Sequence, residues 1–145
     1  MRFMIIRKAD AYTEAEDMPT EQLIADMGSF MEEMAKAGVL VGGDGLKPSR
    51  EGVRINFESG KPTVIDGPFA ETKELVAGFT LIQCGSLEEA VGWMKKWPPL
   101  DGNGNVSLEI RPIYEADDFG EAFTPELREK EDKLRAELAA KAANN

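Results

Sequence analysis

The sequence predicts an α+β fold in which two helices cover one face of an antiparallel sheet. Residues 3–7 are apolar on both alternating faces, and residues 53–57 and 106–110 alternate apolar with polar side chains, as strands do. Residues 23–34 and 87–94 carry apolar side chains every three or four positions, as one face of a helix does. The resulting order of strand, helix, strands, helix and strand predicts a ferredoxin-like βαββαβ sandwich.

The ends of both helices follow from residues that favour helix termini. Thr20 can cap the start of the first helix, and Gly38 can stop it. Ser86 and Glu89 have the spacing of a capping box, in which each side chain satisfies a free backbone amide, so the second helix begins there. The proline pair at 98–99 ends that helix before the last strand.

A β-hairpin is predicted between the two strand-helix-strand halves. Residues 53–58 and 61–66 form its strands, and Ser59-Gly60 supplies the tight turn. A longer strand over 76–84 follows. We expect the hairpin strands to belong to the same sheet as the others.

The face of the sheet away from the helices is expected to be half polar. Arg54 and Asn56 share one strand face, Glu109 and Arg111 share another, and the first strand stays apolar on both sides. A face of this kind is usually covered, and a second copy of the chain is the simplest cover because most soluble oligomers are symmetric homodimers. The sequence therefore predicts a homodimer.

The end of the chain reads as a charged helical extension over residues 117–145, beyond a domain of residues 1–116. Thr124-Pro125 favours a helix start, and only a thin apolar stripe follows. Acidic residues precede basic ones by four positions along it, as in the pair Glu131 and Arg135, and such pairs support a solvated helix.

Composition excludes several partners. The chain carries 27 acidic and 17 basic residues, with a formal net charge of -10, and residues 10–33 contain no Lys or Arg. Nucleic acids and anionic membranes bind clustered basic residues, so we expect neither as a partner. The apolar run at 3–6 is too short to span a membrane, and the single Cys84 favours a buried free thiol. A cytoplasmic location suits both features.

The glycine-rich segment at 42–49 does not have the features of a nucleotide-binding loop. Lys47 does not follow a glycine, Pro48 separates it from Ser49, and a strand rather than a helix comes next. A phosphate loop needs a helix there so that its amides point at the phosphate. We expect a structural loop.

The most informative stretch is residues 66–74, which read DGPFAETKE between two strands. Asp66 cannot form the usual Asx-turn, because the amide two residues on belongs to Pro68 and is missing. A structural role is open, such as capping of the Phe69 amide, and Glu71 and Lys73 could form a solvated ion-pair cluster. A catalytic or binding role is equally open.

The DGPFAETKE stretch resembles the signature of the DGPF branch of the YCII-related family. Residues 42–48, 77–79 and 109–112 resemble the family pattern in the same order, whereas residues 117–145 look like an extension. The resemblance implies a dimeric α+β barrel with a cleft near the dimer interface. It also implies that some relatives are enzymes acting on small substrates through a His-Asp pair.

This chain has no histidine, so a histidine mechanism cannot apply to it. Proton transfer would fall to carboxylates, and Asp66 and Glu71 are the candidate acid/base residues. Carboxylates could in principle hold a hard cation, but His and paired Cys ligands for zinc are missing, and we expect neither a metal nor a cofactor. The candidate ligand contacts are these four residues: Arg54, Lys73, Glu109 and Arg111.

Two functions fit these observations. The first is a homodimer that binds a small, anionic molecule in a cleft at the dimer interface, with lyase or hydrolase chemistry carried by carboxylates. The second is a non-catalytic regulatory or interaction module, functionally linked to a sigma factor of the extracytoplasmic-function type as related genes often are.

Overall fold

The computed structural model describes residues 1–144, and the chain divides into two compact units, 1–113 and 114–145. The first unit is a mixed α+β structure with antiparallel sheets. Its strands are β1 (Arg2–Lys8), β2 (Leu40–Gly45), β3 (Val53–Glu58), β4 (Lys61–Asp66), β5 (Val76–Gln83) and β6 (Leu108–Pro112). Its helices are α1 (Ala11–Glu14), α2 (Glu21–Lys36) and α3 (Leu87–Met94), with short 3-10 turns η1 (Ser49–Glu51), η2 (Thr72–Glu74) and η3 (Asp101–Gly104).

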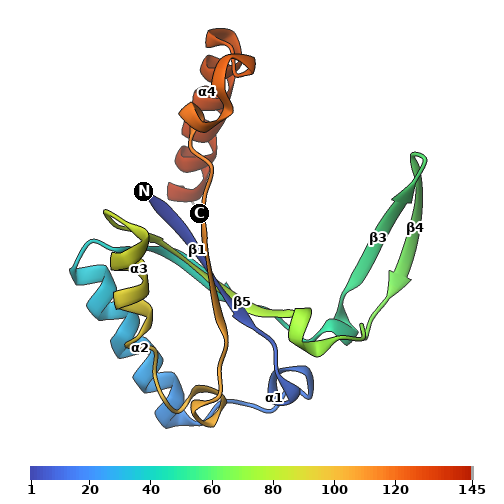
Figure 1. Ribbon diagram of the computed structural model, residues 1–145, viewed down its shortest axis with the longest axis vertical. Coiled ribbons are helices and arrows are strands. Elements are labelled where there is room, and N and C mark those ends of the chain that lie inside the picture. The colour runs from blue at the N-terminus through green and yellow to red at the C-terminus, as the bar shows by residue number, and fades with distance from the viewer. Residues whose placement is uncertain (145) are drawn as a thin grey trace. The chain divides into compact units, whose positions relative to one another are not determined.

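Four strands form the main sheet in the order β2-β5-β1-β6, and each neighbouring pair is antiparallel. β1 lies inside the sheet, as its two apolar faces predicted. Figure 1 shows α2 and α3 together on one face of this sheet. Both helices therefore cover the same face of the sheet, as the sequence predicted.

The core lies between that face and the two helices. Phe3 and Ile5 of β1 and Ile82 of β5 are completely buried, and they pack with Met34 of α2 and Ala90 of α3. Burial of apolar side chains of this size stabilises a fold by about 1.5 to 3 kcal/mol each. The alternating side chains of β1 thus point Phe3 and Ile5 toward α2 and α3.

The predicted helix ends are present with one difference. Thr20 accepts a hydrogen bond from the Leu23 amide, and Ser86 accepts one from the Glu89 amide. The Glu89 carboxylate, however, accepts from the amide of Gly85 rather than from that of Ser86. The second helix is therefore capped by the two expected residues, but Glu89 binds the amide one residue before the one that a capping box uses.

Cys84 is a free thiol that is partly rather than fully buried against the core. Burial raises the pKa of the Cys84 thiol above its ordinary value, and the charge of Glu89 acts in the same direction. The thiol is therefore held in its protonated, unreactive form.

The first half of the glycine-rich segment forms a strand, which corrects the predicted loop at 42–45, whereas residues 46–48 do form a loop. β2 pairs with β5 so that Gly43 lies opposite Thr80 and Gly45 lies opposite Gly78. A Cβ at position 43 would stand 2.5 Å from the Phe79 carbonyl oxygen, so only glycine permits this approach of the two backbones. The strand escaped prediction because glycines carry no apolar alternation.

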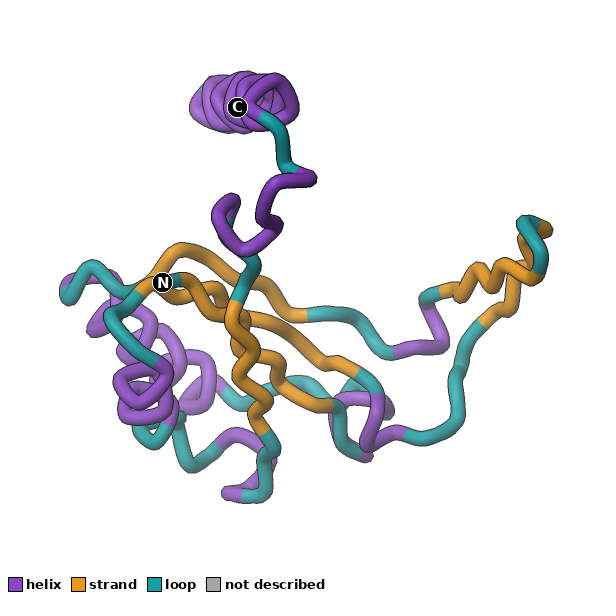
Figure 2. Tube along the Cα trace, turned by 45° about the horizontal axis from the view of Figure 1, so that its top comes forward, coloured by secondary structure: helices purple, strands orange, loops and turns teal. Residues whose placement is uncertain are grey.

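The hairpin is separate from the main sheet, which corrects the prediction that its strands belong to that sheet. β3 and β4 pair only with each other in a two-stranded sheet. Ser59 and Gly60 both have positive φ, the conformation of the tight turn that matches the twist of a hairpin. Figure 2 shows the hairpin standing away from α2 and α3 and joined to the main sheet by loops and short 3-10 turns.

The second unit contains the 3-10 segment η4 (Ala116–Ala122) and the helix α4 (Pro125–Ala143). Thr124 caps α4 by accepting from the Leu127 amide, and Glu131 pairs with Arg135 at 3.0 Å. All of α4 is free of buried residues, in agreement with a solvated helix. In the part of the chain described here, helices that could cross a bilayer are not found.

The close approach at Gly43 gives a first prediction. Gly43→Ala should lower the free energy of unfolding by about 1 to 3 kcal/mol, because the new methyl overlaps the Phe79 carbonyl. Gly42→Ala is the matched control, since a Cβ there meets nothing within 4 Å. Urea unfolding measures both variants, and equal stability of the two would contradict the assigned β2-β5 pairing.

Candidate functional site

A cavity of about 830 Å³ lies between the N-terminal half of α2, the strands β2 and β5, and the loops at 10–20 and 97–103. Leu23, Met27 and Met31 line it from α2, and their four-residue spacing places them on one helix face. Trp97 and Leu100 line it from the loop that follows α3. The walls of this cavity are therefore mainly apolar.

Glycines on the sheet make room for the cavity. Gly43, Gly45 and Gly78 lie on the same face of the sheet as Thr80, which points toward the helices. All four residues line the cavity. A Cβ built on Gly45 would meet nothing within 4 Å. The C-terminal half of α2, by contrast, packs Phe30 and Met34 tightly into the core.

A buried charge network closes one side of the cavity. Arg7 is only 8% exposed, and it holds Asp101 with two hydrogen bonds, from Nη2 at 2.7 Å and from Nε at 3.1 Å. Its Nη1 donates to Asp10 at 2.9 Å and to the Lys8 carbonyl at 2.8 Å. Trp97 Nε1 donates to Asp101 at 2.8 Å. Bidentate Arg-carboxylate pairs of this kind fix geometry as well as charge.

The pKa values of this network follow from its contacts. Burial by itself would lower the pKa of Arg7, but the hydrogen bonds and charges of Asp101 and Asp10 outweigh burial and raise it. Burial would raise the pKa of Asp10, but the Thr13 amide and Arg7 outweigh burial and lower it. Both pKa values thus move further from pH 7, so both groups stay charged at that pH. This suits a role in holding the site in place rather than in transferring protons.

Asp10 also begins α1. Its Oδ1 accepts from the Thr13 amide at 2.9 Å, while its own amide donates to the Thr13 hydroxyl at 2.9 Å. The same carboxylate therefore caps α1 and pairs with Arg7. This double use ties the loop that borders the cavity to the end of β1.

The DGPFAETKE segment lies at the base of the hairpin. Gly67 donates its amide to the Gly52 carbonyl at 3.0 Å, and a Cβ on Gly67 would stand 1.8 Å from the Ser49 carbonyl oxygen. The Phe69 amide donates to the Ser49 hydroxyl at 3.1 Å, and the Arg54 guanidinium lies 4.0 Å from the centre of the Phe69 ring. The segment thus pins the hairpin to its neighbours.

These contacts correct the idea that Asp66 caps the Phe69 amide, because Ser49 takes that role. Ser49 is itself held by Glu14, which accepts from the Ser49 amide at 2.9 Å and from its hydroxyl at 2.6 Å. Asp66 instead ends β4 opposite Val53 and is exposed.

The residues that the sequence singled out fall into two groups, and neither lines the cavity. The first group is exposed at the base of the hairpin and contains Asp66, Glu71, Lys73 and Arg54. The second group is Glu109 and Arg111 on β6, which pair at 3.4 Å. The expectation that Arg54 lies on the open face of the main sheet is wrong, because β3 has left that sheet. Arg111 does lie on that face, and its side chain is 69% exposed in the single chain.

Sequence reasoning missed the Arg7 network, although part of its signal was present. The alternation that places Phe3 and Ile5 on the buried face also places Arg7 there, and a buried arginine requires a partner. Its partner Asp101 lies 94 residues away, and nothing in the local sequence marks it.

The fold and the cavity define a small α+β protein with an apolar pocket beside a buried ion-pair network. Residues 1–117 match the YCII-related domain, and the chain belongs to this family. An uncharacterized protein of Rhizobium meliloti (strain 1021) is 34% identical over 106 residues, which cover 71% of this chain and 80% of that protein.

A solved structure also resembles the chain. It is the 5-chloro-2-hydroxyhydroquinone dehydrochlorinase TftG of Burkholderia phenoliruptrix AC1100 in complex with 2,5-dihydroxybenzoquinone. The match covers 79% of this chain and 95% of that chain, with 12% sequence identity and a TM-score of 0.42.

The lowered pKa of Asp10 gives a second prediction. Asp10→Asn should lower the free energy of unfolding at pH 7 by about 1 kcal/mol, because a charged partner of Arg7 is lost while the helix cap remains. The Asp10 carboxylate stabilises the fold above its unfolded pKa of about 3.9, and this stabilisation disappears as the pH falls through the lower folded pKa. The difference between variant and wild type should therefore shrink in acid.

Urea unfolding at pH 7 and at pH 3 measures this difference. Asp17→Asn is the control, since Asp17 also lines the cavity but is exposed. A destabilisation by Asp10→Asn that is as large at pH 3 as at pH 7 would contradict the charge pairing.

Proposed function

We propose that this chain is a small-molecule binding protein whose ligand occupies the cavity beneath the N-terminal half of α2. The supporting observation is the cavity itself, about 830 Å³ in volume, with apolar walls and a locked polar network on one side. Ligand sites in proteins are typically cavities of about 300 to 1,000 Å³ with mainly apolar walls and a few well-placed polar groups. This cavity has both properties.

The charges around the cavity favour a neutral or positively charged ligand with an apolar body. Among the residues that the structure describes, Arg7 is the one cation in the lining, and its charge is already matched by Asp10 and Asp101. Asp17 and Asp44 add further negative charge to the lining. An anion would meet this negative potential without a free cation to offset it. The proposal therefore differs from the anionic ligand expected from Arg54 and Arg111.

Catalysis by the hairpin carboxylates stays a prediction. Asp66 and Glu71 are exposed at the base of the hairpin, outside the cavity lining. A lyase or hydrolase reaction that used them would take place on that surface, with Arg54 and Lys73 as the nearby cations. Membership of the DGPF branch is likewise a proposal, and it is based on the sequence DGPFAETKE of residues 66–74. The glycine and the phenylalanine of this stretch make structural contacts.

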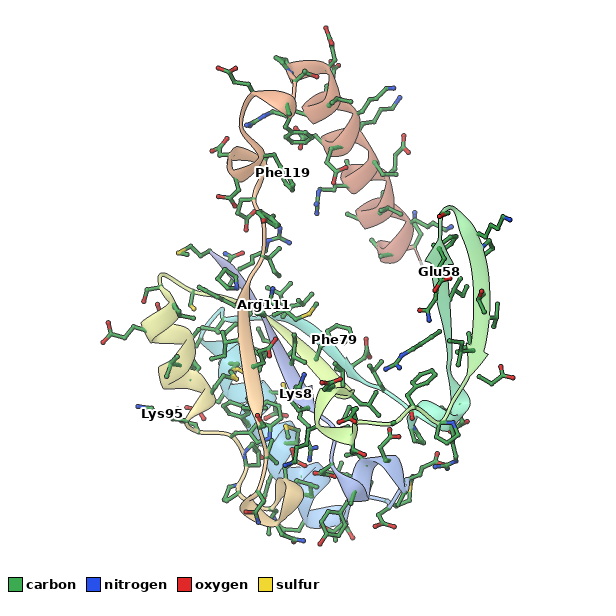
Figure 3. The ribbon with its side chains drawn as sticks, turned by 45° about the vertical axis from the view of Figure 1, so that its right-hand side comes forward. Lys8, Glu58, Phe79, Lys95, Arg111 and Phe119 are labelled. Carbon is green, nitrogen blue, oxygen red and sulfur yellow. The ribbon has the colours of Figure 1, made fainter. Side chains whose placement is uncertain are left out.

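We also propose that the fold is the ferredoxin-like βαββαβ sandwich and that two copies pair through their sheets as a dimeric α+β barrel. The strand order β2-β5-β1-β6 supports the first part. The face of the sheet away from the helices supports the second. Its centre is apolar, and by register Met4 lies opposite Leu81 while Ile6 lies opposite Phe79. The adjacent positions on β6 are Arg111 and Glu109. Figure 3 shows Arg111 on this strand.

Ligand binding gives the third prediction. The neutral 2-naphthylmethanol and the cationic 2-naphthylmethylamine should raise the melting temperature, whereas the anionic 2-naphthoate should not. A ligand at 100 times its dissociation constant stabilises a protein by about 2.7 kcal/mol. Leu23→Trp should abolish the rise because the indole fills the cavity, and Ile24→Trp should preserve it because Ile24 is 61% exposed outside the lining.

Differential scanning fluorimetry with each compound measures these shifts. A rise with 2-naphthoate that Leu23→Trp removes would contradict the charge preference. Equal shifts in Leu23→Trp and Ile24→Trp would contradict the location of the site.

Pairing through the sheet gives the fourth prediction. Leu81→Glu should convert a dimer into a monomer, because it would bury an unpaired carboxylate between the two sheets. Ser29→Glu is the control, since it adds the same charge at an exposed position of α2, on the side of the sheet away from this interface. Sedimentation equilibrium measures the masses, and a Leu81→Glu protein that stays dimeric would rule out this interface.

A further inference from the structure

One face of the hairpin presents apolar side chains to solvent along its whole length. The β3-β4 register places Ile55 opposite Val64 and Phe57 opposite Pro62, on the same face as Val53. Ile55 is 55% exposed, Phe57 is 69% exposed and Val64 is 62% exposed. Both strands are exposed at every position. We call this surface, made of residues 53, 55, 57, 62 and 64, the hairpin face.

The hairpin face stands on a firmly attached base. The Gly67 amide bonds the Gly52 carbonyl, and Arg54 stacks on Phe69 from the opposite face of β3. Arg50 pairs with Glu16 and donates to the Glu14 carbonyl, which connects the base to the loop after α1. The chain therefore holds an apolar two-stranded sheet out from the domain with many specific contacts.

A surface of this kind needs a cover. A two-stranded hairpin alone is at best marginally stable in water, and soluble monomers rarely expose contiguous large apolar patches. We propose that the hairpin face is an interaction surface for a second copy of this chain.

Charge and area both suit a second copy. The chain carries a net charge of -10, which opposes contact between most parts of two copies. The hairpin face is free of charge up to Asp66 at its base, because Glu58 and Lys61, which lie opposite each other at the tip of the hairpin, belong to its other face. Figure 3 shows Glu58 at this tip.

The area follows from the exposed side chains. Each of the five side chains exposes roughly 80 Å² of apolar surface, so two hairpins and the surfaces that they cover would bury on the order of 1,600 Å². That area lies in the range of specific protein interfaces, about 1,200 to 2,000 Å². Twofold symmetry would cover both hairpins with one arrangement, since each copy supplies one hairpin and covers one.

This inference rests on the proposed dimer and goes beyond it by giving the hairpin a part in the interface. Ile55→Asp places a charge in the centre of the hairpin face, and Asn56→Asp places the same charge on the opposite face of the same strand. Both positions are exposed within one copy, so both variants should fold. Circular dichroism confirms folding before the masses are compared.

Sedimentation equilibrium should show dimers for the wild type and Asn56→Asp, and a dimer dissociation constant at least 100-fold weaker for Ile55→Asp. If Ile55→Asp dimerises as tightly as the wild type while Leu81→Glu does not, the sheet dimer stands and the role of the hairpin is overturned. A wild type that is monomeric at 100 μM overturns both.

A second measurement does not depend on destabilising the dimer. The photo-reactive residue p-benzoylphenylalanine replaces Phe57 in one variant and Asn56 in another. Irradiation should give a covalent dimer from position 57 and little from position 56. Absence of a covalent dimer at position 57, with crosslinking only to lipid or to an added unrelated protein, would overturn the proposal.

Discussion

The ion-pair network of Arg7 is the interaction on which the arrangement of the first unit depends. Arg7 occupies the buried face of β1 next to Ile5, where an unpaired guanidinium would be very costly. Asp101 and Asp10 therefore have to approach it, and they bring with them the loop after α3 and the start of α1. Trp97 adds a bond to Asp101 and packs edge-on against Phe30 of the core. One buried charge thus positions two loops and an aromatic side chain.

The same constraint explains why a cavity survives where a core would be expected. The loops that Arg7 holds form two sides of a space whose floor consists of glycines and Thr80. These glycines let β2 and β5 approach each other closely, but they leave nothing to fill the volume beneath α2. The space opens to solvent and has mainly apolar walls, which is the form that ligand sites in proteins typically take.

The sequence predicted those parts of the fold that local patterns encode. The alternation of β1, the periodicity of α2, and the caps at Thr20 and Ser86 are each confirmed because a few neighbouring residues decide them. β2 was missed because a strand of glycines has no pattern, and the hairpin was assigned to the main sheet because its own alternation cannot reveal its partner. The Arg7 network was missed for a related reason, because its partner Asp101 is distant in sequence.

The DGPFAETKE segment has structural roles that do not depend on its charged residues. Ionisable residues in a loop suggest chemistry, yet the contacts that require specific residues here belong to Gly67 and Phe69, which carry no charge. Gly67 is required because no Cβ fits beside the Ser49 carbonyl, and Phe69 because its ring carries Arg54. A hairpin that merely closed a loop would need neither contact. Such specific attachment has a purpose if the hairpin must be held at a fixed angle to the domain, as an element that reaches another subunit must be.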